Sequence, residues 1–162
     1  MARLRHDHRA STLRVLVVED HAPFRTVICS TLSKKRGFQQ IVEASDGFEA
    51  VQKAQELQPD LILLDIGLPT LNGIKAAHRI REVSKKSKVL FLTQESSEDV
   101  VQEALKSGAR GYVIKINAAK DLIAAVDAVL RGEQFLGSGV ANPSLLSDAS
   151  SFRYVDKSGA GA

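Results

Sequence analysis

The sequence has a single cysteine, Cys29, among its 162 residues. An intrachain disulfide is therefore excluded, and this low cysteine content fits a reducing cytoplasm. No apolar run reaches the roughly 18 residues that a membrane-spanning helix needs, and the N-terminus is too polar for a secretory signal peptide. These absences argue against a disulfide-rich secreted domain and against a membrane protein, so we expect a cytoplasmic protein.

Most of the chain also lacks a net charge. Residues 1–14 contain four arginines and one aspartate, which accounts for the whole formal net charge of +3. The remainder is neutral, so we expect no direct nucleic-acid contact from the folded part. A basic arm could touch nucleic acid, but we favour a solvated, flexible terminus at residues 1–12.

The overall composition is that of an ordinary globular domain. Hydrophobic residues make up 44% of the chain and charged residues 25%, which supplies enough apolar side chains for a core. The length predicts one domain and a tail. We expect the domain at 13–135 and a Gly/Ser-rich tail or linker at 136–162, with at most a short helix near 143–146.

Five short apolar runs alternate with five helical patterns. We predict strands at 14–20, 41–44, 61–64, 88–93 and 111–115, and helices at about 23–36, 47–57, 72–83, 97–107 and 117–131. Apolar runs without alternation are typical of strands buried on both faces of a parallel sheet. The prediction is an α/β fold: a flavodoxin-like (βα)5, doubly wound, parallel five-stranded sheet with strand order 2-1-3-4-5.

Polar side chains end four of these strands. In a parallel sheet the carboxyl ends of the strands share one edge, where α/β proteins bind their ligands. Close carboxylates repel one another unless a cation intervenes, and oxygen ligands suit Mg²⁺. A lysine and a hydroxyl nearby suit an anion, and the whole set suits phosphoryl transfer to an aspartate. The side chains are Glu19, Asp20, Asp65, Thr93 and Lys115.

At this point the sequence resembles the response-regulator receiver domains of two-component signalling. The motifs are VVEDH at 17–21, LLDIGLP at 63–69, LT at 92–93 and GYVIK at 111–115. They occur in the family's order, and the resemblance covers about residues 13–135. The stretch from 108 to 136 further resembles receivers of the LuxR/FixJ-type subfamily, which usually precede a helix-turn-helix domain.

The resemblance implies a role for each residue of the acidic edge. Asp65 is expected to accept a phosphoryl group from a histidine kinase. Asp20 is expected to bind Mg²⁺ directly and Glu19 through water, and Asp65 with the backbone carbonyl of Gly67 completes the protein ligands. Lys115 is expected to bind a phosphoryl oxygen.

Two further residues are implied to form a switch. The hydroxyl of Thr93 is expected to move onto another phosphoryl oxygen, and Tyr112 matches the aromatic residue whose rotamer follows that threonine. The sequence departs from the family at Ile116, where proline or a small polar residue is frequent, and at Gln94, where a small residue is usual. Because Gln94 is bulky, we expect slow phosphorylation by small donors and slow loss of phosphate.

The resemblance predicts a phospho-accepting signalling protein that assists its own phosphorylation and dephosphorylation, rather than an enzyme. Its expected partner is a sensor histidine kinase or phosphotransfer protein that docks near the first helix, and a homodimer could form through the fourth helix, fifth strand and fifth helix. One alternative is a truncated LuxR-type transcriptional regulator without its helix-turn-helix domain. Another is a small aspartyl-phosphate phosphohydrolase, but that chemistry needs a carboxylate just after the nucleophile, where Gly67 stands.

Overall fold

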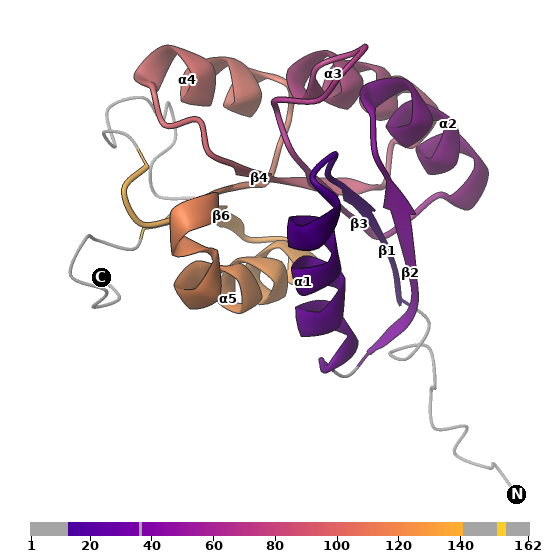
Figure 1. Cartoon of the computed structure of the whole chain (residues 1–162). Coiled ribbons are helices and arrows are strands. Elements are labelled where there is room, and N and C mark those ends of the chain that lie inside the picture. The colour runs from indigo at the N-terminus through magenta and orange to yellow at the C-terminus, as the bar shows by residue number, and fades with distance from the viewer. Residues whose placement is uncertain (1–12, 36, 141–151, 155–162) are drawn as a thin grey trace, which may run out of the picture.

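A parallel sheet with helices on both faces forms the protein (Figure 1). The computed structural model describes residues 13–35, 37–140 and 152–154. The strands are β1 (Leu13–Val18), β2 (Phe38–Ala44), β3 (Leu61–Leu64), β4 (Lys88–Thr93), β5 (Gly111–Ile114), β6 (Gln134–Leu136) and β7 (Phe152–Tyr154). The helices are α1 (Ala22–Ser33), α2 (Gly47–Leu57), α3 (Gly73–Val83), α4 (Glu98–Lys106) and α5 (Ala118–Leu130), with a 3-10 turn, η2, at Lys115–Asn117.

The strand order is β2-β1-β3-β4-β5-β6-β7, and every neighbouring pair is parallel. The predicted fold class and the order 2-1-3-4-5 are confirmed for the first five strands. The prediction of only five strands was incomplete, because β6 and β7 extend the sheet beyond β5. The short helix expected near 143–146 and the arm at 1–12 lie outside the described residues.

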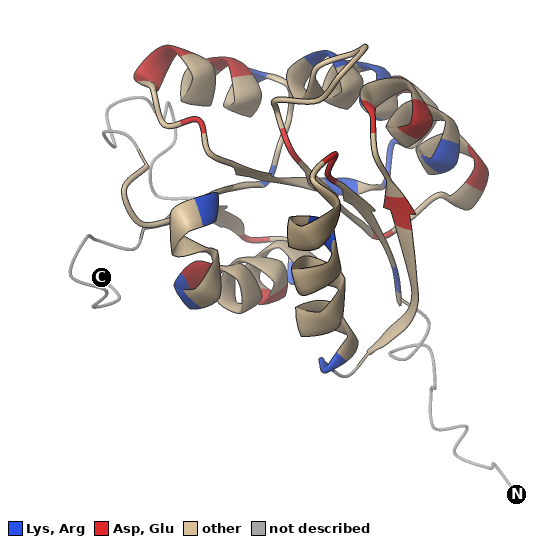
Figure 2. Cartoon of the chain, in the orientation of Figure 1, with Lys and Arg blue, Asp and Glu red and all other residues tan. Residues whose placement is uncertain are grey.

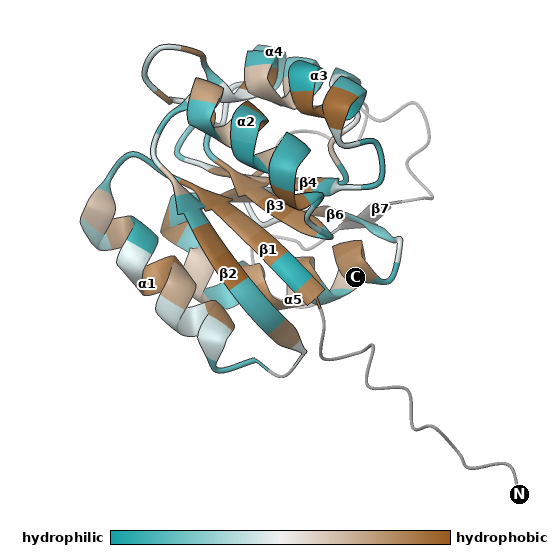
Figure 3. Ribbon diagram, turned by 90° about the vertical axis from the view of Figure 1, so that its right-hand side faces the viewer, coloured by the Kyte–Doolittle hydropathy of each residue, from teal (hydrophilic) through white to brown (hydrophobic). Residues whose placement is uncertain are grey.

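Both faces of the sheet are apolar, because alternate residues of each central strand point to opposite sides. In β1, Val15 and Val17 belong to the apolar layer that α1 and α5 cover, whereas Leu16 and Val18 belong to the layer that α2, α3 and α4 cover. The hydropathy colouring of β1 and β3 shows the same apolar centre (Figure 3). This two-sided burial explains why the strands read as continuous apolar runs. None of the helices within the described ranges is long and apolar enough to cross a bilayer.

Local sequence signals set the helix starts. Asp46, Asn72 and Ser97 precede α2, α3 and α4, and each side chain accepts a hydrogen bond from the backbone N–H three residues later. Such caps satisfy amides that the first turn leaves unpaired. The boundaries of these helices therefore follow closely from the sequence.

Two glycines allow helices to approach the loop that follows β3. A Cβ atom added to Gly73 would lie 1.9 Å from the backbone carbonyl oxygen of Asp65, and one added to Gly47 would lie 1.9 Å from that of Leu71. The backbone N–H of Gly73 also donates to the carbonyl of Ile66 at 2.8 Å. Close backbone contact with α3 thus fixes the chain at Asp65 and Ile66.

We predict that Gly73→Ala destabilises the fold by about 3 kcal/mol, because the methyl group must displace backbone rather than a flexible side chain. Urea-induced unfolding monitored by circular dichroism measures this change. Gly67→Ala is the matched control, since a Cβ at Gly67 meets no atom within 4 Å, and we expect it to change stability by less than about 0.5 kcal/mol. Equal stabilities of the two variants would contradict the close contact.

Candidate functional site

Three carboxylates converge where β1 and β3 end. Glu19 and Asp20 follow β1, and Asp65 follows β3, which pairs with β1 in register. The backbone N–H of Asp65 donates to the carbonyl of Val18 at 3.1 Å, so the chain ends of the two strands stay side by side. One carboxylate oxygen from each of Glu19, Asp20 and Asp65 lies within 4.8 Å of the others. The acidic residues mark this edge of the sheet in Figure 2.

Lys115 places its ammonium between two of these carboxylates. The Nζ atom lies 2.5 Å from Oε1 of Glu19 and 2.9 Å from Oδ2 of Asp65. It also lies 5.1 Å from the centre of the Phe24 ring on α1, within reach of a cation–π contact. Burial by itself lowers the pKa of Lys115, but its hydrogen bonds to Glu19 and Asp65 outweigh this and raise that pKa. These carboxylates therefore stabilise the charged form of Lys115.

The cluster keeps an excess of negative charge, because one ammonium faces three carboxylates. Glu19 and Asp65 are buried, whereas Asp20 is exposed. Burial raises the pKa of Glu19, the hydrogen bond from Lys115 partly opposes this, and the nearby charge of Asp65 raises it further. Carboxylate oxygens with a solvent-exposed member are the donor set that Mg²⁺ prefers. The residues present therefore fit a magnesium ion that keeps several water ligands.

The cluster opens into a cleft of ≈ 740 Å³. The acidic groups line this cleft together with the apolar side chains of Phe24, Val27 and Ile116. Gly67 also lines the cleft, and its N–H donates to Oδ1 of Asp65 at 3.3 Å. A small anion can thus reach Asp65 from solvent and meet Lys115 at the same time.

Thr93, at the end of β4, and Tyr112, on β5, both form hydrogen bonds to the loop residue Glu95. Thr93 is fully buried at the end of β4, and its Oγ1 accepts a hydrogen bond from the N–H of Glu95 at 3.4 Å. The hydroxyl of Tyr112 donates to the carbonyl of Glu95 at 2.8 Å, and burial raises the pKa of Tyr112 well above its ordinary value. Both side chains therefore hold the same residue of the loop after β4.

The structure thus brings Glu19, Asp20, Asp65, Gly67 and Lys115 together at one edge of the sheet. It places Thr93 and Tyr112 around the loop after β4, and no hydrogen bond among the described residues joins either of them to Asp65.

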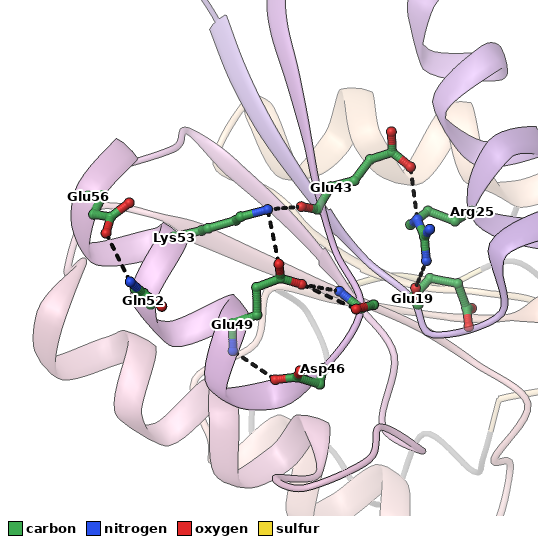
Figure 4. A network of polar contacts seen from close by, with 9 residues as sticks. Glu19, Arg25, Glu43, Asp46, Glu49, Gln52, Lys53 and Glu56 are labelled. Carbon is green, nitrogen blue, oxygen red and sulfur yellow. Dashed lines mark hydrogen bonds and ion pairs between the residues drawn. The ribbon is translucent and has the colours of Figure 1, made fainter.

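Sequence reasoning missed the role of Arg25. Its Nη1 donates to the carbonyl of Glu19 at 2.6 Å, and its Nε donates to Oε1 of Glu43 on β2 at 2.8 Å (Figure 4). Arg25 therefore fixes the backbone from which the Glu19 carboxylate projects. The only signal in the sequence was an arginine in the first turn after Pro23, which is too common to single out.

Comparison with known families gives one match that covers most of the chain. The family model described as the response regulator receiver domain matches residues 15–127. Among curated proteins, the response regulator protein VraR of Staphylococcus aureus is 38% identical over 122 residues, which is 75% of this chain and 58% of the relative. The chain therefore spans little more than half the length of these curated relatives.

Solved structures with similar folds include several receivers. A two-component response regulator of the LuxR family from Aurantimonas sp. SI85-9A1 superposes with a TM-score of 0.73 and 28% identity, covering 86% of this chain and 96% of that one. The signal receiver domain of the putative response regulator NarL from Mycobacterium tuberculosis gives 0.71 and 28%, covering 76% and 99%. The response regulator domain of Thermotoga maritima CheB gives 0.68 and 30%, covering 74% and 97%.

The raised pKa of Glu19 predicts a pH-dependent stability in metal-free buffer. A carboxyl whose pKa is higher in the folded state loses its contribution to stability as the pH rises from its ordinary value of 4.5 through the folded value. We therefore predict that Glu19→Gln is more stable than the parent at pH 7, and that the difference shrinks as the pH falls toward 4.5. Thermal unfolding in EDTA measures it, and Glu56→Gln on the exposed face of α2 is the matched control variant.

Proposed function

The chain belongs to the response regulator receiver domain family, and on that premise we propose that Asp65 accepts a phosphoryl group from a sensor histidine kinase or phosphotransfer protein, with Mg²⁺ as cofactor. The observation that carries this proposal is the position of the Asp65 carboxylate. It is buried at the floor of an open cleft, bonded to Lys115 and flanked by the oxygens of Glu19 and Asp20. The protein would act in the cytoplasm, where such kinases present their phosphohistidine.

In the proposed reaction an oxygen of Asp65 attacks phosphorus, and the P–N bond to the donor histidine breaks. The product is a mixed anhydride on Asp65, and the imidazole leaves with the bond's electron pair. Lys115 would bind a phosphoryl oxygen and so balance the charge that spreads over the transferring group. Glu19, Asp20, Asp65 and the carbonyl of Gly67 would hold Mg²⁺, which would neutralise the charge of donor and acceptor.

A switch would follow from the groups around Glu95. In the unphosphorylated state Thr93 and Tyr112 hold this loop residue. A phosphoryl group on Asp65 offers the Thr93 hydroxyl a stronger, charged acceptor. Turning Thr93 toward it would release the N–H of Glu95 and loosen the packing around Tyr112, which shifts the population toward an active surface.

Two surfaces fit the expected partners. Val27 is 57% exposed and Ile116 87% exposed, and both lie beside the acidic cleft with Phe24. This apolar rim suits a kinase or phosphotransfer helix that brings its phosphohistidine to Asp65. A homodimer through α4, β5 and α5 would have to include β6, because β6 lies along the outer edge of β5.

The geometry gives little support to a phosphohydrolase. Within the described part of the chain, the acidic residues that line the cleft are Glu19, Asp20 and Asp65, and all of them belong to the proposed acceptor and metal set. The greater length of the VraR relatives leaves room for a regulator with a DNA-binding half, in which this receiver would act as the switch.

We predict that phosphoramidate and Mg²⁺ add one phosphoryl group to the protein, detectable by intact mass spectrometry, and that Asp65→Asn abolishes it because the amide is not nucleophilic. Lys115→Ala should slow the reaction about tenfold to a hundredfold, the loss expected for a hydrogen bond to a charged group. Asp46→Asn, which changes the cap of α2, is the control and should react at the normal rate. An adduct that survives in Asp65→Asn would refute Asp65 as the acceptor.

Gln94 lines the cleft, and we predict that it restricts access to the phosphoryl group. Gln94→Ala should therefore speed both phosphorylation by phosphoramidate and spontaneous loss of phosphate by several-fold, measured by mass spectrometry over time. Gln52→Ala on α2 is the control. Unchanged rates in Gln94→Ala would contradict the idea that Gln94 restricts access to the phosphoryl group.

A further inference from the structure

Ser138, two residues after β6, has three polar groups bound by Asn117 at the end of η2 and by Asp121 in the first turn of α5. Its N–H donates to Oδ2 of Asp121 at 2.8 Å, and its hydroxyl donates to Oδ1 at 3.3 Å. The side-chain amide of Asn117 donates to the carbonyl of Ser138 at 2.9 Å. We call Asn117, Asp121 and Ser138 the clamp.

The clamp consists of hydrogen bonds between buried polar groups and not only of apolar packing. Asp121 and Ser138 are only 2% and 4% exposed, and a buried carboxylate is unfavourable unless it is hydrogen-bonded. The backbone also passes through a narrow space. The N–H of Gly137 donates to the carbonyl of Tyr112 at 2.9 Å, and a Cβ at Gly137 would lie 3.1 Å from both Asp121 Oδ2 and that carbonyl oxygen. The segment 137–138 is therefore held directly between β5 and α5.

The clamp begins two residues after Lys115, in the same turn. The turn η2 comprises Lys115–Asn117, and the N–H of Ala118 closes it on the carbonyl of Lys115. Ile116, the middle residue, is 87% exposed and contributes little anchorage. The turn is thus fixed on one side by the ion pairs of Lys115 with Glu19 and Asp65, and on the other by Asn117 bonded to Ser138.

We propose that this turn transmits the phosphorylation state of Asp65 to the C-terminal segment, with Asn117 and Asp121 as positioning residues. The inference rests on the proposed function. A phosphoryl group on Asp65 changes the partners of the Lys115 ammonium. Because η2 is a single short turn, a shift of Lys115 moves Asn117 and alters its hydrogen bond to the carbonyl of Ser138. Coupling between two sites is reciprocal, so the clamp also biases the position of Lys115.

This route is distinct from the Thr93–Tyr112 switch. That switch acts on the loop after β4, whereas the clamp acts on the chain that leaves β6. A purely structural clamp would stabilise the segment 137–140 equally whether or not Asp65 carries phosphate. A coupling clamp makes the protection of this segment depend on the phosphate.

Hydrogen–deuterium exchange of the full chain, with and without phosphoramidate and Mg²⁺, separates these two roles. In the parent we expect the amide of Ser138 and its neighbours to change exchange rate on phosphorylation by about fivefold or more, within the range of typical coupling between sites. In Asn117→Ala the adduct should still form, but the change at Ser138 should vanish. Asp121→Asn, which keeps the shape of the side chain but has one acceptor oxygen fewer, should reduce it.

Asp46→Ala is the matched control, because it removes the cap of α2 on the opposite face of the sheet and should leave the change at Ser138 intact. An adduct on the parent without any change at Ser138, or the same change in Asn117→Ala, would overturn the clamp proposal while leaving the phosphoacceptor in place. Failure of the parent to form any adduct would instead overturn the proposed function, and the coupling with it.

Discussion

The buried ion pairs of Lys115 are the interaction on which the site depends. A single ammonium lies between Glu19 and Asp65, which come from different strands and would otherwise repel each other at close range. The pairing draws β1, β3 and β5 together at their carboxyl ends. Because three carboxylates outnumber the one cation, the site keeps an excess of negative charge, and its oxygen donors fit a divalent ion.

This balance of charges depends on backbone contacts that hold the site residues in place. Arg25 binds the carbonyl of Glu19, so the carboxylate projects from a backbone that cannot turn away. Gly73 lets α3 press against the carbonyl of Asp65. In the proposed function, a small movement at a phosphoryl group on Asp65 would then be passed on, because the elements around the site have few alternative positions. The loop at Glu95 and the turn that follows Lys115 are the two places where bonds to the site's neighbours can rearrange.

The C-terminal segment covers the side of β5 that would otherwise be an edge of the sheet. In a five-stranded sheet β5 would be an edge, but here β6 pairs with it and the residues after β6 are bonded to α5. The described residues that follow β6 are therefore held beside Asn117 and Asp121.

The sequence by itself determined the alternation of strands and helices, the strand order of the first five strands, and the residues of the acidic edge. The alternation follows from local signals, because two-sided burial gives unbroken apolar runs and caps and glycines mark helix ends. The strand order and the shared edge follow from general rules of topology, because crossovers between parallel strands are right-handed and parallel strands bring their carboxyl ends to one edge. The cap of α4 is one such local feature, because the side chain of Ser97 accepts a hydrogen bond from the N–H of Val100.

Only the tertiary structure decided what depends on contacts between residues distant in the chain. Nothing local distinguishes Arg25 from a solvated arginine, or Asp121 from an ordinary charged residue in a helix, until Glu19 and Ser138 are folded against them. The strands β6 and β7 were missed for a related reason. They are three residues long, which is too short to carry a periodic pattern, and their pairing depends on a sheet edge that exists only after the rest of the chain has folded.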